Sequence, residues 1–152
     1  MLVLKTFARY WLPLVTWMTM IFVVSADQES AQHSSRILEP LLRWLFPKLT
    51  PEQVGPVVFA IRKLAHSTEY AVLAALSWRA MRRPVRDDPR PWRWSHAFFA
   101  LLLTVGYAAS DEFHQSFVPT RTGTVWDVVI DSGGAMLGLA AVWLWGRVKR
   151  RW

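Results

Sequence analysis

Cysteine is absent from the 152-residue sequence, which excludes disulfides, catalytic thiolates and zinc sites built on cysteine. The sequence also contains no internal repeat, no low-complexity tract and no HExxH zinc-binding motif. No serine lies in a GxSxG motif, so a nucleophile of the α/β-hydrolase type is not indicated. These absences remove several enzyme classes that short motifs identify, and they leave the redox compartment undecided.

Apolar and aromatic residues are abundant instead. Hydrophobic residues make up 53% of the chain, ten residues are tryptophan and the mean hydropathy is +0.17. This composition is typical of a small membrane protein rather than of a soluble domain. Four segments approach the ~20 residues that a bilayer crossing requires. They are residues 7–24, 57–78, 95–109 and 125–145. We therefore predict one all-α domain over residues 1–152, an integral membrane four-helix bundle.

Two parts of this bundle are less well defined by the sequence. The third segment is short, so Tyr107 and the residues after it could continue the helix or re-enter the membrane toward Pro119. Between the first two segments, apolar residues recur at helical spacing among Arg and Glu, which predicts a short amphipathic helix at the membrane interface. An ordinary packed loop helix is the alternative. The residues that carry this pattern are Ile37, Leu38, Leu41, Leu42, Leu45 and Phe46.

The net charge of +7 is concentrated in three regions. Basic residues lie at Lys5 and Arg9, in the loop of residues 79–93 and in residues 147–151. The positive-inside rule places these regions, and with them both termini, in the cytoplasm. Topology thus explains the basic excess, and no aromatic-interleaved basic groove indicates a nucleic-acid partner.

The end of the first apolar segment has a second interpretation. Val24, Ser25 and Ala26 fit the small-residue rule of a signal-peptidase site, and cleavage there would leave three spans. Because the apolar run has nearly full membrane length, we expect this helix to be retained.

In this orientation, each of the four segments carries polar residues toward its extracytoplasmic end. At about 100° per residue, Arg62, His66 and Glu69 share one face of the second helix. Tyr107, Asp111 and His114 share a face of the third, and Asp127 and Asp131 share a face of the fourth. The remaining polar residues at this depth are Ser25, Asp27, Lys63, Tyr70, Glu112, Gln115 and Arg121.

Ionisable groups inside a membrane are costly unless they are paired or face water, so we expect these side chains to surround one shared cavity. The alternative is that they only hold the bundle together, as close packing at Gly133, Gly134 and Gly138 would. A buried salt bridge stabilises poorly for its desolvation cost, which favours a binding site. Asp127 and Asp131 with His114 or His66 could hold a divalent cation, but no specific zinc motif supports this, and we expect no metal. The sequence leaves the identity of any cofactor open.

The same residues resemble a known family. Ser25, "RKLAHSTEY" (residues 62–70) and "YAASDEFHQSFVPTRTGTVWDVVIDSGGAMLG" (residues 107–138) are similar to the VanZ-like family of small bacterial membrane proteins. The resemblance implies a four-helix membrane domain and, for some members, lowered susceptibility to teicoplanin-type glycopeptides. Its most specific positions are Asp111, Glu112, His114, Gln115, Arg121, Asp127 and Asp131.

Two functions compete. In the first, Arg62, Lys63 and Arg121 bind the phosphate or carboxylate of an anionic lipid or envelope precursor. In the second, a membrane-embedded hydrolase or transferase uses His114 or His66 as acid or base, with Asp111 and Glu112 beside it. Ion transport is a weaker third, because the cytoplasmic halves of the helices carry almost no polar residues.

Overall fold

The computed structural model describes residues 2–26, 30–85, 88, 90–118, 123–149 and 151. Of the described residues, 85% are helical, and none of them lies in a strand. The first helix is continuous from α1 (Leu2–Thr6) through a π-helical turn, η1 (Phe7–Trp11), into α2 (Leu12–Ala26). It is followed by α3 (Ser30–Leu45), α4 (Pro51–Arg82), α5 (Trp94–Gln115) and α6 (Val125–Val148). The all-α prediction is confirmed, whereas a four-helix membrane bundle stays a prediction.

Local sequence signals set the ends of α4. Thr50 caps its first turn, and the Gln53 side chain accepts a hydrogen bond from the Thr50 amide at 3.0 Å, completing a capping box. Pro51 occupies the first helical position, where no amide donor is needed. At the other end, Arg83 adopts a left-handed conformation with φ 49°, directly before Pro84. The resulting helix of 32 residues is longer than the predicted span.

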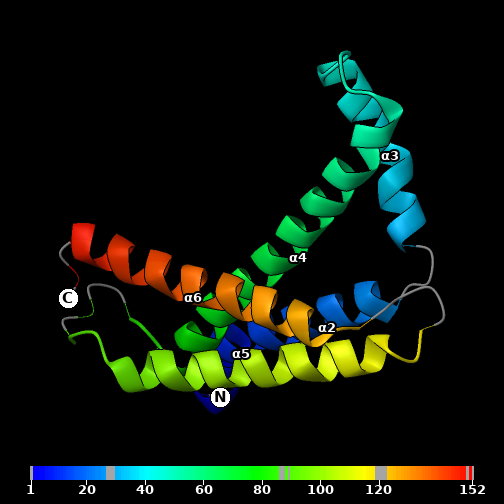
Figure 1. Ribbon diagram of the computed structural model, residues 1–152. Helices are drawn as coiled ribbons and strands as arrows, with labels where there is room; N and C mark the ends of the chain where they lie inside the picture. Colours follow the sequence, from blue (N-terminus) through cyan, green and yellow to red (C-terminus); the bar gives the residue numbers. More distant parts are fainter. Residues whose placement is uncertain are drawn as a thin grey trace.

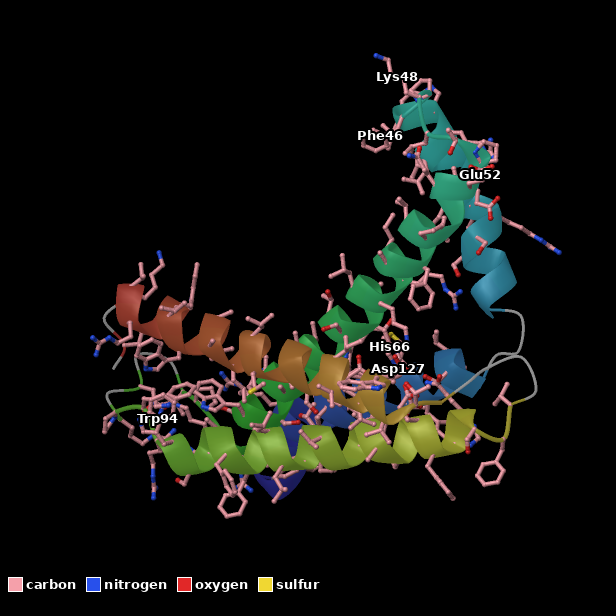
Figure 2. All side chains as sticks on the ribbon, in the orientation of Figure 1. Phe46, Lys48, Glu52, His66, Trp94 and Asp127 are labelled. Carbon is pink, nitrogen blue, oxygen red and sulfur yellow. The ribbon has the colours of Figure 1, made fainter. Side chains whose placement is uncertain are left out.

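The helices form a layer and an arm (Figure 1). Helices α2, α5 and α6 and the C-terminal half of α4 pack together in the layer, and the N-terminal half of α4 leaves it beside α3. We call residues 30–61, which comprise α3, the connection after it and the start of α4, the arm. Figure 2 shows Phe46, Lys48 and Glu52 at the tip of the arm, and His66 and Asp127 where α4 meets the layer.

Small side chains bring α4 and α6 close together. A Cβ atom on Gly134 would collide with Ser67, and one on Gly138 would collide with the Ala71 backbone. By contrast, a Cβ atom on Gly133 would meet nothing within 4 Å. The predicted close packing is therefore confirmed for Gly134 and Gly138 and is wrong for Gly133.

The predicted amphipathic helix is present as α3. Leu38 and Leu42 pack on Val54 and Val58 of α4. The side chains of Val54 and Val58 are only 2% and 4% exposed. Other apolar residues of α3 point outward, including Trp44, which is 75% exposed. One part of the apolar face is thus packed as in a loop helix, and the other part is exposed; an interfacial position of α3 stays a prediction.

Two helices are long and apolar enough to cross a bilayer, Leu4–Ser25 and Val125–Val148, within the part of the chain that the structure describes. Only 17% and 22% of the residues in their most apolar windows are buried. A core helix of a soluble protein would be mostly buried, so these exposed apolar surfaces suggest a membrane protein. The third predicted span continues as helix through Tyr107 to Gln115, as one of the two expectations had it.

Candidate functional site

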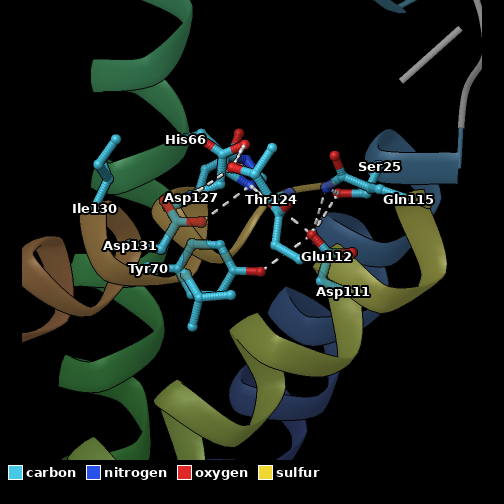
Figure 3. A network of polar contacts seen from close by, with 12 residues as sticks. Ser25, His66, Tyr70, Asp111, Glu112, Gln115, Thr124, Asp127, Ile130 and Asp131 are labelled. Carbon is cyan, nitrogen blue, oxygen red and sulfur yellow. Dashed lines mark hydrogen bonds and ion pairs between the residues drawn. The ribbon is translucent and has the colours of Figure 1, made fainter. Parts of the chain in front are cut away.

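Polar side chains from four helices meet at one place in the layer (Figure 3). We call this cluster the polar centre; its members are Ser25, Lys63, His66, Glu69, Tyr70, Asp111, Glu112, Gln115, Thr124, Asp127 and Asp131. They come from the end of α2, the middle of α4, the end of α5 and the start of α6. In Figure 1 these parts lie toward the end of the layer opposite to the C-terminus.

Asp111 is 2% exposed and connects three helices. Its Oδ2 accepts hydrogen bonds from Ser25 Oγ at 2.9 Å, from Tyr70 Oη at 3.1 Å and from Gln115 Nε2 at 2.9 Å. Ser25 lies in the last turn of α2, Tyr70 lies on α4 and Gln115 lies one turn after Asp111 on α5. One carboxylate oxygen is therefore fully occupied, and the orientation of the carboxylate is fixed.

His66 faces the acidic residues of the centre. Its Nδ1 lies 3.2 Å from Glu69 Oε2, one turn further along α4. Its Nε2 lies 3.8 Å from Asp111 Oδ2, 3.9 Å from Glu112 Oε1 and 3.4 Å from Asp131 Oδ2. These three separations exceed a normal hydrogen bond, so the imidazole points at three carboxylates without bonding to any of them.

The start of α6 forms the other side of the centre. The Thr124 amide donates to Glu112 Oε2 at 3.0 Å, and the Thr124 hydroxyl donates to Asp127 Oδ2 at 3.0 Å. Lys63 forms an ion pair with Asp127 Oδ1. The Thr124 side chain also accepts a hydrogen bond from the Asp127 amide. The residue that caps the N-terminus of α6 is therefore itself part of the polar centre.

Three buried polar atoms of the centre have no hydrogen-bond partner among the described residues. They are His66 Nε2, Asp111 Oδ1 and Asp131 Oδ2. Asp131 is 2% exposed, and an uncompensated buried carboxylate costs several kcal/mol. His66, Asp111 and Glu112 each place one potential metal ligand within 4.8 Å of the others. The centre can therefore orient an imidazole against carboxylates or hold a cation.

Most of the residues predicted from the sequence lie in the centre. The structure brings together Lys63, His66, Glu69, Asp111, Glu112, Gln115, Asp127 and Asp131. Whether they bind a ligand or perform chemistry stays a prediction.

Tyr107 and His114 lie outside the centre. Tyr107 donates to the Met18 carbonyl at 2.6 Å and joins α5 to α2. The His114 ring lies against Phe22, with centroids 4.7 Å apart, and no hydrogen bond or ion pair joins it to a described residue of the centre. Arg62 is half-buried on α4. Arg121 and Asp27 lie outside the described residues.

Thr124 is the member that the sequence analysis missed. A signal for it exists, because Thr124 and Asp127 form the Thr-x-x-Asp pattern of a helix start directly before an apolar run. Its amide contact with Glu112 depends on tertiary structure. A Cβ atom on Gly123, one residue earlier, would collide with the Glu112 carbonyl, so the chain approaches α5 closely here.

Comparison with known proteins gives one match. No curated protein and no solved structure matches the chain. A family model described as VanZ/LLP1 matches residues 10–146, which include every described member of the polar centre. The match covers most of the sequence and agrees with the resemblance of the motifs on α4, α5 and α6. The chain belongs to the VanZ/LLP1 family.

Proposed function

We propose that this chain is a multi-pass protein of the bacterial cytoplasmic membrane. The helix of residues 2–26 and helices α4, α5 and α6 cross the bilayer, and membrane lipids cover their exposed apolar side chains. Both termini and the α4–α5 connection lie in the cytoplasm, and the polar centre opens on the extracytoplasmic side.

Contacts between the basic regions support this orientation. The Tyr10 hydroxyl donates to the Pro84 carbonyl at 2.6 Å, and the Arg79 guanidinium lies 5.4 Å from the Tyr10 ring centroid. A pocket lined by Pro84 and Arg82 is also lined by Trp145 and Arg151. The N-terminal helix, the α4–α5 connection and the C-terminus are therefore neighbours, as the positive-inside rule requires.

Tryptophans at the same end provide further support. Trp78 stacks on Trp92 at 5.1 Å between ring centroids, and Trp94 lies 6.2 Å from Trp143. The Arg147 guanidinium lies 5.5 Å from the Trp143 ring centroid. Tryptophans mixed with basic residues are typical of the membrane–water interface.

In this proposal the polar centre binds the head group of an anionic lipid or of a lipid-linked envelope precursor. The observation that carries it is the convergence of polar side chains from four helices at one buried place. Lys63 lies at this place, and Arg62 and Arg121 are the further cations of the proposal. Two or three polar residues would suffice to join the helices, and each additional buried charge carries a desolvation cost. Head-group binding accounts for the excess, and in some relatives it would change how teicoplanin-type glycopeptides engage the envelope.

Native mass spectrometry of the detergent-purified protein tests this proposal. The variant Asp111→Asn/Asp127→Asn is compared with Glu39→Gln/Glu52→Gln, which neutralises two exposed carboxylates of the arm. We expect a lipid mass that stays on the wild type and the arm variant and is lost from the centre variant. Equal retention by all three proteins would contradict the proposal.

One observation favours an enzyme as the second candidate. A carboxylate at one imidazole nitrogen, as at Glu69 and His66, is the arrangement that orients a histidine for proton transfer. We assign this role to His66 rather than His114, because His66 Nε2 faces the centre. The reaction would be hydrolysis or transfer at a lipid-linked phosphate or acyl group.

Turnover of a panel of lipid phosphates and acyl lipids by the purified protein tests the enzyme. His66→Ala should abolish product formation, and His114→Ala should retain it. No product from any lipid, or equal loss in both variants, would count against catalysis by this centre.

A further inference from the structure

We propose that the polar centre binds a divalent transition-metal cation, Zn²⁺ or Mn²⁺, through His66, Asp111 and Glu112, with Asp131 beside them. This inference goes beyond lipid binding and does not depend on it, because it concerns only the acidic side of the centre. It reverses the expectation from the sequence, which offered no zinc motif.

The separations in the centre suit a cation. A tetrahedral zinc ion with bonds of 2.0–2.1 Å holds its ligand atoms about 3.4 Å apart. His66 Nε2 lies 3.4 Å from Asp131 Oδ2 and 3.9 Å from Glu112 Oε1. These distances are too long for hydrogen bonds and close to those between the ligands of one ion.

The atoms around this cluster are already held in place. The contact of His66 Nδ1 with Glu69 Oε2 leaves the Nε2 lone pair available when Nδ1 carries the proton. Asp111 Oδ2 accepts three hydrogen bonds, and Glu112 Oε2 accepts one from the Thr124 amide. This is the pattern of a metal site, in which outer hydrogen bonds orient the ligands.

The buried polar atoms that have no hydrogen-bond partner support the same conclusion. Asp111 Oδ1, Asp131 Oδ2 and His66 Nε2 are buried and have no hydrogen-bond partner in the described part of the chain. Asp111 and Asp131 are each 2% exposed, so water does not replace those partners at the surface. A metal ion would bind such atoms directly.

Charge balance also favours a cation. Three carboxylates face one imidazole, and Lys63 is engaged by a fourth carboxylate, that of Asp127. A proton on His66 Nε2 would supply one positive charge and would leave the carboxylates unbalanced at low dielectric. A divalent cation supplies two charges at the point that all three carboxylates face.

The donor set identifies the class of metal. One imidazole with carboxylate oxygens suits Zn²⁺ or Mn²⁺, whereas Mg²⁺ and Ca²⁺ prefer oxygen ligands alone. Soft Cu⁺ sites are excluded because the sequence has no cysteine and the centre has no methionine. Three protein ligands would leave a coordination position open, as in catalytic zinc sites.

The test uses the full chain, purified in detergent through an affinity tag without histidine and stripped with a chelator. Zn²⁺ or Mn²⁺ alone is added, and metal content and melting temperature are measured. We expect about one tightly held equivalent per chain and a melting temperature that rises with metal concentration, because a ligand that binds only the folded state stabilises it. No uptake and no rise with either ion would overturn the proposal and leave His66 as a protonated partner of the carboxylates.

Variants separate this site from adventitious binding. His66→Gln should abolish the metal-dependent rise, and His114→Gln, the same change on α5 outside the centre, should retain it. Glu69→Gln, which alters only the outer hydrogen bond, should weaken metal affinity by about 10–100-fold. Equal binding by His66→Gln and the wild type would place the metal elsewhere and overturn the assignment.

Asp131→Asn guards against variants that fail to fold. It removes a buried charge without a hydrogen-bond partner, so the metal-free variant should melt at or above the metal-free wild type. The same variant should gain less from Zn²⁺ or Mn²⁺ than the wild type gains. A variant that gains as much would show that Asp131 does not belong to the site. Because the metal is measured without lipid, failure of this inference and failure of head-group binding remain distinguishable.

Discussion

Tyr70 joins the apolar core to the polar centre through a single side chain. It is completely buried beside Leu73, and its hydroxyl donates to Asp111 at 3.1 Å. Its ring also lies edge-on to His66, with centroids 5.2 Å apart. The phenol therefore fixes the position of a carboxylate that the proposed metal site uses.

Tyr70→Phe keeps the ring and removes this donor. We expect the free energy of unfolding in detergent to fall by about 1–3 kcal/mol, because a buried carboxylate loses a hydrogen bond. Tyr107→Phe removes a hydroxyl that donates to the Met18 carbonyl instead, and it should leave metal affinity unchanged. If Tyr70→Phe neither destabilised the protein nor weakened metal binding, its hydrogen bond would have no role in the centre.

At the scale of helices, the contact between α4 and α6 sets the geometry of the centre. Gly138→Ala would push a methyl group into the Ala71 backbone, which neither helix can avoid without separating. We expect a loss of about 1–3 kcal/mol in the free energy of unfolding, as for other overpacked sites.

Gly133→Ala is the matched control in the same helix. Its methyl group would meet nothing within 4 Å. Alanine favours a helix over glycine by up to about 1 kcal/mol, so this variant should be as stable as the wild type or more stable. Equal destabilisation by both changes in detergent unfolding would mean that close packing against Ala71 does not determine the effect of Gly138→Ala.

In the connection between α4 and α5, the Asp88 carboxylate pairs with Arg90 and Arg82. Arg90 donates hydrogen bonds to both Asp88 oxygens, at 2.8 and 2.7 Å, and Arg82 Nε lies 3.6 Å from Asp88 Oδ2. The hydrogen bonds from Arg90 lower the pKa of the Asp88 carboxyl. Because the folded pKa lies below the unfolded value of about 4, the stabilisation is present at neutral pH and is lost as pH falls through and below that value.

Asp88→Asn should therefore lower the melting temperature at pH 7 more than at pH 3. Glu39→Gln, on the exposed side of α3, is the control and should show no such difference. Melting curves of the three proteins at both pH values measure the effect. A pH-independent difference between Asp88→Asn and the wild type would mean that this ion pair does not contribute.

On the scale of the whole molecule, the sequence predicted the helices better than their arrangement. Helical spacing and apolar length predicted five helices and the face on which Asp127 and Asp131 lie. Spacing alone could not choose between His66 and His114, because each shares a helix face with acidic residues, and only packing turns His114 toward Phe22. The arm was also not predicted, because hydropathy does not reveal that α4 leaves the layer to bury Val54 and Val58 against α3.

The proposed topology places the two ends of the layer on opposite sides of the membrane, and thiol labelling can test this placement. The chain has no cysteine, so a single introduced thiol is the only reactive one. Val125 at the start of α6 is 80% exposed, and Val85 in the α4–α5 connection is 58% exposed. If the basic end is cytoplasmic, a membrane-impermeant maleimide should label Val125→Cys in intact spheroplasts and Val85→Cys only after permeabilisation. The reverse pattern would invert the protein and place the polar centre in the cytoplasm, where its ligand would be a cytoplasmic head group. Labelling of both sites before permeabilisation would mean that α5 does not cross the membrane, and the four-span topology would be wrong.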